Sequence, residues 1–102
     1  MRIVSEKAPK LFWHRHVDAE GPLKDWLEVA RVAAWRNLAE VRQTFRHADV
    51  VQVSSGKNVV VFNIGGNKYR LVAAVHYNTG TVYTLLVMTH QGYSAGRWKN
   101  QL

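Results

Sequence analysis

An arginine and a histidine near the ends of predicted strands are the residues of this sequence best suited to chemistry at a phosphate. The planar guanidinium of Arg70 can donate to two phosphate oxygens and stabilise negative charge that develops on them. His90 can move a proton, because the unperturbed pKa of histidine lies close to neutrality. Asn63 and Lys68 lie close to Arg70 in the sequence and add a polar and a cationic group. These four side chains could bind a phosphate and transfer a proton beside it if the fold brings them together.

Metal and thiol chemistry are not expected. The chain has no cysteine, which excludes disulfides, thiolate metal sites and cysteine nucleophiles. Among the five histidines only His14 and His16 are close together, and no carboxylate or further histidine stands at a spacing typical of zinc sites. We therefore expect neither a metal site nor a cofactor.

A surplus of positive charge indicates a polyanionic partner. The chain carries 14 lysines and arginines against 7 aspartates and glutamates, a formal net charge of +7. In a chain of 102 residues this surplus favours nucleic acid as the partner. The alternatives are a basic surface that keeps the protein soluble, and one that an acidic protein covers. Because 7 of the 14 cations precede Asn37, the charge is not a basic tail and folding must gather it.

Length and hydropathy indicate one small domain away from membranes. A chain of 102 residues can form one core but not two, so we expect a single domain over residues 1–102. The longest apolar runs, such as Leu71–Val75 and Leu85–Met88, are too short to cross a bilayer. No apolar stretch that could act as a signal peptide follows the first residues. We expect a cytoplasmic protein with no membrane partner.

The first half of the chain has the pattern of helices, over residues 7–47. One helix is predicted from Ala8-Pro9, and a second from Gly21-Pro22, because proline is tolerated in a first helical turn. A helical pattern continues after Asn37. The apolar stripe of the second helix follows a period of 3.6 residues and consists of Leu23, Trp26, Leu27, Ala30, Ala33 and Ala34. Tryptophans 13, 26 and 35 are expected to pack in the core or to face a protein partner, rather than to stack on bases.

The second half has the pattern of strands, over residues 50–53, 59–64, 69–77 and 81–89. Short connections rich in glycine, serine and asparagine separate them, which predicts an antiparallel meander. Ile3-Val4 before the first helix suits an initial strand. The expected fold class is α+β, with the helices on one face of the sheet and the other face free to bind a ligand.

The register of the predicted strands places the polar side chains together. If Asn78-Thr79-Gly80 is a three-residue loop, Arg70 faces Met88 and Lys68 faces His90. If Gly66-Asn67 is a two-residue turn, Asn63 faces Arg70. Asn63, Lys68, Arg70 and His90 then share the open face near one end of the sheet, whereas a shift of one residue would separate them. The opposite face is the predicted core and carries Phe62, Ile64, Tyr69, Leu71, Ala73, Val75, Leu85 and Val87. The same polar residues could instead be ordinary solvated strand residues.

Two segments of the chain resemble the HigB toxin family within the RelE-like superfamily. The first is Val61–Val72, with the sequence VFNIGGNKYRLV, and the second is Val87–Tyr93, with the sequence VMTHQGY. Their spacing also fits the family. The resemblance extends from about Asn58 to Tyr93 and is looser in the first half, where the order of strand and helices agrees.

This resemblance implies a RelE-like fold, in which N-terminal helices pack on one face of a curved antiparallel sheet whose other face is concave. It implies ribosome-dependent cleavage of mRNA, and neutralisation by a cognate HigA-type helix-turn-helix antitoxin. Arg70 stands at the strand arginine that contacts the scissile phosphate, and His90 and Tyr93 stand in the segment that closes the active site. Further positions that match polar or basic residues of related toxins, as expected RNA-binding residues, are Asn63, Lys68, Lys57 and Lys99.

The expected function is a metal-independent endoribonuclease, in which the RNA 2′-OH attacks the scissile phosphate. The family carries a histidine near the end of the last strand where RelE has a site rich in lysine and arginine, so the proton transfers can differ. The alternatives are a non-catalytic basic RNA-binding module and a module whose basic face meets an acidic protein. The joint presence of Arg70, His90 and Tyr93 favours the nuclease, because a binding module needs no titrating residue. Tyr93 could donate to the phosphate or stack on a base.

Overall fold

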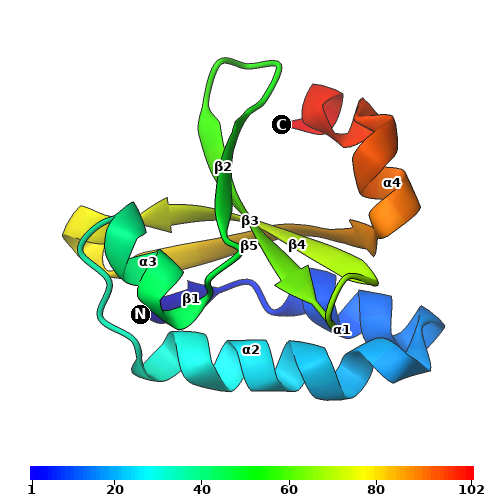
Figure 1. The fold of residues 1–102 in the computed structure, drawn as a ribbon, viewed down its shortest axis with the longest axis horizontal. Coiled ribbons are helices and arrows are strands. Elements are labelled where there is room, and N and C mark those ends of the chain that lie inside the picture. Colours follow the sequence, from blue (N-terminus) through cyan, green and yellow to red (C-terminus); the bar gives the residue numbers. More distant parts are fainter.

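A five-stranded sheet with helices packed along one face forms the protein (Figure 1), in a computed structural model that describes residues 1–102. The strands lie in the order β1-β5-β4-β3-β2. Their bounds are β1 Arg2–Val4, β2 Asp49–Gln52, β3 Asn58–Ile64, β4 Tyr69–His76 and β5 Thr81–Thr89. The antiparallel meander of β2 to β5 is confirmed, and so is the initial strand. Because β1 joins the edge of β5 in parallel, the sheet is mixed.

The helical layer consists of three helices rather than two. Their bounds are α1 Lys7–Arg15, α2 Glu20–Val32 and α3 Leu38–Thr44, with a short 3₁₀ turn η1 at Val17–Ala19. Pro22 lies in the first turn of α2, as expected, where its missing N–H has no intrahelical partner to lose. The chain leaves α2 at Val32, so Ala33 and Ala34 are not helical, contrary to the prediction. Asn37 starts α3 separately, because its Oδ1 accepts the backbone N–H of Glu40 at 2.9 Å.

The main core lies between the helices and the sheet. Trp26 and Trp35 are buried there around Phe62, and Trp13 packs at the edge. The predicted core face of the sheet is confirmed at Phe62, Ile64, Tyr69, Leu71 and Ala73, all of which are buried in this cluster. The α+β class, with helices on one face, is therefore confirmed.

The predicted register is confirmed around Arg70, which pairs with Asn63 on β3 and with Met88 on β5. The loop between β4 and β5 is one residue longer than predicted, since it comprises a 3₁₀ turn η2 at Tyr77–Thr79 and then Gly80. A bulge between Val72 and Ala73 absorbs the difference, so that Ala73 pairs with Thr84. The bulge also turns Leu85 to the face opposite the helices, which corrects its expected place in the main core.

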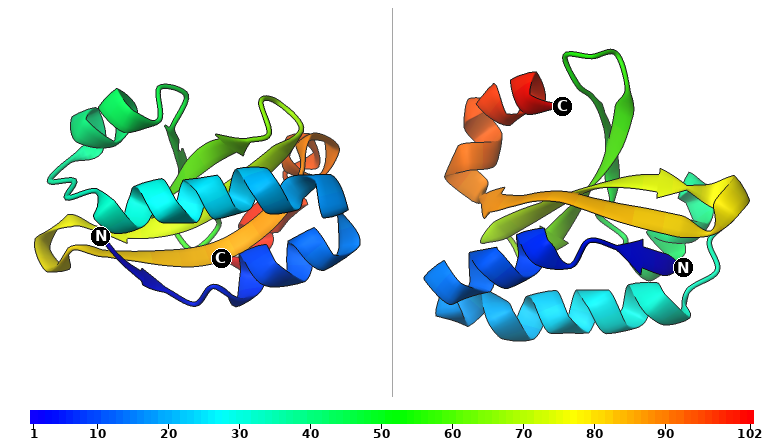
Figure 2. Two further views of the ribbon diagram at one scale, coloured as in Figure 1. Left: turned by 90° about the horizontal axis from the view of Figure 1, so that it is seen from below. Right: turned by 180° about the vertical axis from the view of Figure 1, so that it is seen from behind.

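The face opposite the helices is not free, contrary to the prediction. After β5 the chain forms α4, His90–Ala95, and a 3₁₀ turn η3, Arg97–Gln101, which fold back over the sheet (Figures 1 and 2). Gly96 makes the reversal between them with a φ of 78°. Trp98 is 4% exposed and forms a second core with four valines, which are Val53, Val59, Val61 and Val72. The C-terminal segment therefore covers part of this face, with Trp98 at the centre of the contact.

No helix of the protein is both long and apolar enough to cross a membrane.

Candidate active site

Arg70 lies on the sheet face opposite the main core, where its side chain is buried and only 8% exposed. Its Nη1 donates to the backbone oxygens of Tyr69 at 3.0 Å and Asn67 at 3.3 Å, and its Nη2 donates to the Asn67 Oδ1 at 2.5 Å. No carboxylate lies within 4.0 Å of this guanidinium, since it takes part in none of the six ion pairs. A guanidinium has five N–H groups, so two of them remain to donate to a ligand.

The burial of Arg70 corrects the expectation that it lies on an open surface. The cause is the C-terminal segment, which brings two aromatic rings to the start of β4. The Arg70 guanidinium carbon lies 5.6 Å from the centroid of the Tyr93 ring, and Tyr93 stacks on Trp98 with centroids 5.5 Å apart and planes 20° apart. The Trp98 indole N–H also donates to the backbone oxygen of Tyr93 at 3.1 Å. Arg70, Tyr93 and Trp98 thus form one column, which we call the Arg70 column.

His90 is the first residue of α4 and is exposed. Its backbone N–H donates to the Lys68 oxygen at 2.9 Å, which confirms the predicted pairing of these two positions. Thr89 starts the helix by accepting the Gly92 N–H at 3.0 Å, and this cap turns the chain away from the strand direction. The imidazole makes no hydrogen bond within the protein, so both ring nitrogens are available to a ligand. His90 and Tyr93 lie three positions apart on the same short helix.

Lys68 does not join the other predicted residues on their face. Its Nζ lies 3.3 Å from the Asp18 carboxylate, in the helical layer, because Lys68 belongs to the Gly65–Lys68 turn and escapes the alternation of β4. The Tyr69 hydroxyl donates to the same carboxylate at 2.5 Å. This hydrogen bond, with a smaller contribution from Lys68, lowers the pKa of Asp18, and it raises the pKa of Tyr69. The group Asp18, Lys68 and Tyr69 therefore anchors the β3–β4 hairpin to the helices.

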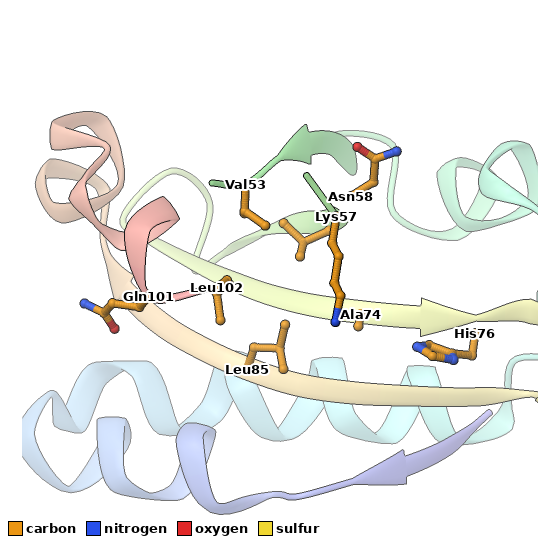
Figure 3. A pocket seen from close by; sticks show the side chains of 9 residues that line it. Val53, Lys57, Asn58, Ala74, His76, Leu85, Gln101 and Leu102 are labelled. Atoms are coloured by element: carbon orange, nitrogen blue, oxygen red, sulfur yellow. The ribbon is translucent and has the colours of Figure 1, made fainter. Parts of the chain in front are cut away.

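Asn63 is half-buried on β3 directly across from Arg70, as predicted, and its side chain makes no hydrogen bond. Lys57 lies just before β3, and Lys99 lies in η3. Lys57 lines a cleft of about 520 Å³ (Figure 3), together with Ala74, His76 and Leu85. The Lys99 Nζ lies 6.0 Å from the Trp98 ring centroid. The structure thus brings Asn63, Arg70, His90 and Tyr93 to one end of the sheet. The Lys68 side chain instead pairs with Asp18 in the helical layer, and the Lys99 side chain lies beside Trp98.

Positive charge predominates around the site. All seven aspartates and glutamates precede residue 50, and residues 50–102 hold five lysines and arginines but no acid. Of these five cations only Lys68 has a carboxylate within 4.0 Å. The sheet and the C-terminal segment therefore present uncompensated positive charge, which suits an anionic ligand. No group of three or more histidines, cysteines, aspartates or glutamates could hold a metal ion.

Two residues of the site escaped sequence reasoning. Asn67 holds the Arg70 guanidinium through both its side chain and its backbone oxygen. Its position in the Gly-Gly-Asn turn, three residues before Arg70, could have indicated that it lies beside the Arg70 side chain. Trp98 supports Tyr93 from outside every predicted element, and its position beyond the last predicted strand gave no sign of a partner.

One comparison with known proteins identifies the family. No curated protein matches the chain significantly. A family model, described as HigB_toxin, the RelE-like toxic component of a toxin-antitoxin system, matches residues 19–96. The matched region contains α2, α3, the β2–β5 meander and the whole of α4, and so includes Arg70, His90 and Tyr93. The chain belongs to the HigB family of RelE-like toxins of toxin-antitoxin systems.

Proposed function

We propose that this toxin is a metal-independent endoribonuclease that cuts mRNA on the ribosome and so inhibits translation. The observation that carries the proposal is the Arg70 column. A buried guanidinium without a carboxylate, held in place by Asn67 and Tyr93, keeps two N–H groups for an anion. A structural arginine is normally paired when it is buried, so an unpaired one suits a ligand that brings the negative charge.

The reaction balances with this chain, the RNA and solvent water, which can make the proton transfer that His90 does not make and which hydrolyses the cyclic phosphate. The ribose 2′-oxygen forms a bond to the scissile phosphorus as its proton leaves to a base, and the bond from phosphorus to the 5′-oxygen breaks as that oxygen receives a proton. The products are a 2′,3′-cyclic phosphate, or the 3′-phosphate after hydrolysis, and a 5′-hydroxyl. Arg70 stabilises the charge that builds on the phosphate oxygens. His90 performs one of the two proton transfers, for which its free imidazole is suited.

Tyr93 acts through its hydroxyl in this proposal. An indole stacks on its ring and a guanidinium lies over it, which leaves little of the ring for a base. A hydrogen bond from its hydroxyl to the phosphate is therefore favoured over base stacking. Asn63 contacts the RNA beside Arg70, and Lys57, Lys68 and Lys99 contribute to a wider basic surface for RNA. The cognate HigA-type helix-turn-helix antitoxin neutralises the toxin.

The test is cleavage of a defined mRNA on bacterial ribosomes, with the new ends mapped and their phosphates identified. His90→Gln should slow single-turnover cleavage by about a hundred- to ten-thousand-fold, the usual contribution of general acid–base catalysis. His47→Gln is the matched control, because His47 is also exposed but lies in the α3–β2 turn. Tyr93→Phe should also slow cleavage strongly, because it removes the hydroxyl that donates a hydrogen bond to the phosphate.

Two outcomes would overturn the proposal. If the wild-type protein binds ribosomes and stops translation while the mRNA stays intact, the toxin is a non-catalytic RNA-binding module. If His90→Gln cuts with the wild-type rate, His90 takes no part in the reaction and only begins α4.

A further inference from the structure

The cleft that Lys57 lines is separate from the Arg70 column. It has a volume of about 520 Å³ and lies on the sheet face opposite the helices, between the β2–β3 loop, strands β3 to β5 and residues 101–102 (Figure 3). Small-molecule sites typically have volumes of about 300–1,000 Å³. Arg70, His90 and Tyr93 do not line this cleft. Its far end, at His76, lies six residues along β4 from Arg70, which corresponds to about 20 Å of extended strand.

The floor of the cleft is apolar. The bulge between Val72 and Ala73 turns Leu85 to this face. Ala74 follows on the same face as Val72 and carries only a methyl group, so it leaves space that a larger side chain would fill. The other apolar residues of the lining also take part in the second core or pack against it, and they are Val53, Val59 and Leu102. A planar ring can pack against this surface.

Two side chains with free nitrogen atoms lie over this floor. Figure 3 shows the Lys57 side chain extended into the cleft toward Ala74. The Lys57 Nζ makes no hydrogen bond and has no carboxylate within 4.0 Å. The His76 ring packs edge-on against Tyr83, with centroids 5.0 Å apart, and its nitrogens make no hydrogen bond. Because no aspartate or glutamate lines the cleft, Lys57 and His76 suit an anionic group.

Two amides complete the lining. Asn58 begins β3 and Gln101 ends η3, both residues are exposed, and neither side chain makes a hydrogen bond within the protein. An amide carries a donor and an acceptor side by side, as the edge of a nucleobase does. Gln101 and Leu102 lie outside residues 19–96, so the match to the family does not account for this cleft.

We propose that the cleft binds one nucleotide, with its base on the apolar floor and its phosphate at Lys57 and His76. The nucleotide is either a free mononucleotide or one residue of an RNA strand, and the same groups recognise it in both cases. An alkyl carboxylate would also bring an apolar body and a negative charge, but it would leave both amides without partners. The inference concerns binding and does not depend on RNA cleavage.

The experiment is a titration of the full chain with adenosine monophosphate, followed by NMR of the backbone amides. The signals of residues 57–59, 74–76 and 101–102 should shift together with one dissociation constant. Ala74→Leu fills the floor and leaves every charge in place, so it should weaken this binding about tenfold or more. Ala8→Leu is the matched control, because Ala8 lies on α1, on the other side of the sheet.

The contribution of charge is tested in the same way. Lys57→Gln should weaken binding of adenosine monophosphate about tenfold, since it removes a charged donor to the phosphate. Lys7→Gln is the matched control, because Lys7 is also exposed and has no carboxylate within 4.0 Å, but lies on α1. It should bind almost as the wild type does. The unshifted signals of each variant show whether it is folded.

A second titration distinguishes the two sources of the nucleotide. It uses a short single strand of 2′-O-methyl RNA, which cannot supply the 2′-OH nucleophile. If the cleft takes one residue of an RNA strand, the strand shifts the signals of the cleft together with that of Arg70, and Ala74→Leu weakens its binding. If the cleft takes a free nucleotide, only adenosine monophosphate shifts the signals of the cleft. A protein that cuts no RNA would still give either result.

Four results would overturn the proposal. In the first, neither ligand shifts the signals of the cleft. In the second, inorganic phosphate shifts them with the same dissociation constant as adenosine monophosphate, so that the base contributes nothing. In the third, octanoate displaces adenosine monophosphate at equal concentration, which would make the cleft a site for alkyl anions. In the fourth, each control variant weakens binding as much as its partner does, so that only general charge and stability matter.

Discussion

Replacement of Arg70 by methionine should separate function from stability. Methionine has a similar length, fills the space beside Tyr93, and makes favourable sulfur–aromatic contacts. The variant loses three hydrogen bonds from a charged donor, each worth about 1.5–3 kcal/mol. It also loses the contact with the Tyr93 ring, worth about 0.5–2 kcal/mol.

Removal of the buried charge should at the same time stabilise the folded protein by a similar amount. Taking a guanidinium out of water costs several kcal/mol, and no carboxylate near Arg70 offsets that penalty. The abandoned acceptors include both oxygens of Asn67, an exposed turn residue that water can reach. We therefore expect Arg70→Met to lower the free energy of unfolding by less than about 3 kcal/mol.

Cleavage should respond very differently. Removal of a single donor to a developing oxyanion slows other enzymes by about a hundred- to a thousand-fold, and Arg70→Met removes all such donors at this position. Urea unfolding followed by tryptophan fluorescence, together with single-turnover cleavage on ribosomes, measures both quantities. A variant that loses more than about 3 kcal/mol would show that Arg70 is mainly structural. A stable variant that still cuts mRNA would refute its role at the phosphate.

Three further predictions follow from the same geometry. Trp98→Ala should lower the free energy of unfolding by about 3–5 kcal/mol in urea titrations, since it empties the second core, while Trp98→Phe should lose far less. The hydrogen bond from Tyr69 holds the pKa of Asp18 below its ordinary value, so Asp18 stabilises the fold above that value, about 3.9, and this contribution is lost as pH falls through the lowered pKa. Asp18→Asn should therefore flatten the acid side of the stability profile, as seen by unfolding at a series of pH values. Any cleavage of free RNA should persist in excess EDTA; a complete loss that zinc or manganese restores would contradict the metal-free mechanism.

Much of the fold could be predicted because the strands follow simple rules of alternation and turn length. Asn63, Arg70 and Met88 share a face in the structure as the register predicted. The longer β4–β5 loop and the bulge at Leu85 were not predictable. Each shifts the pairing of β4 with β5 by one residue, and the two shifts cancel, so the pairing of Arg70 is the same as predicted. A bulge reflects packing of the whole strand rather than a local signal.

The candidate site was harder to predict where residues leave regular strands. Lys68 lies two positions before Arg70, so strand alternation would place both on the same face. It lies instead in a turn, and its side chain binds Asp18, a residue 50 positions away. Trp98 lies outside every predicted element, and only tertiary packing places it on Tyr93. Both errors come from long-range contacts, which hydrophobic periodicity does not encode.

The distribution of acids determines where the protein keeps its positive charge. Every ion pair of the protein uses a carboxylate from residues 1–49, and five of the six pairs lie wholly within those residues. The helical layer is thereby largely neutralised at short range, whereas the sheet and the C-terminal segment keep their positive charge. RNA at the Arg70 column would neutralise part of this field. Its binding should therefore weaken as salt shortens the screening length, from about 10 Å at 0.1 M to about 3 Å at 1 M. Hydrogen bonds from the two remaining N–H groups of Arg70 act at short range and should be screened much less. The salt dependence of RNA binding by wild type and Arg70→Met therefore separates the general attraction from the local contact.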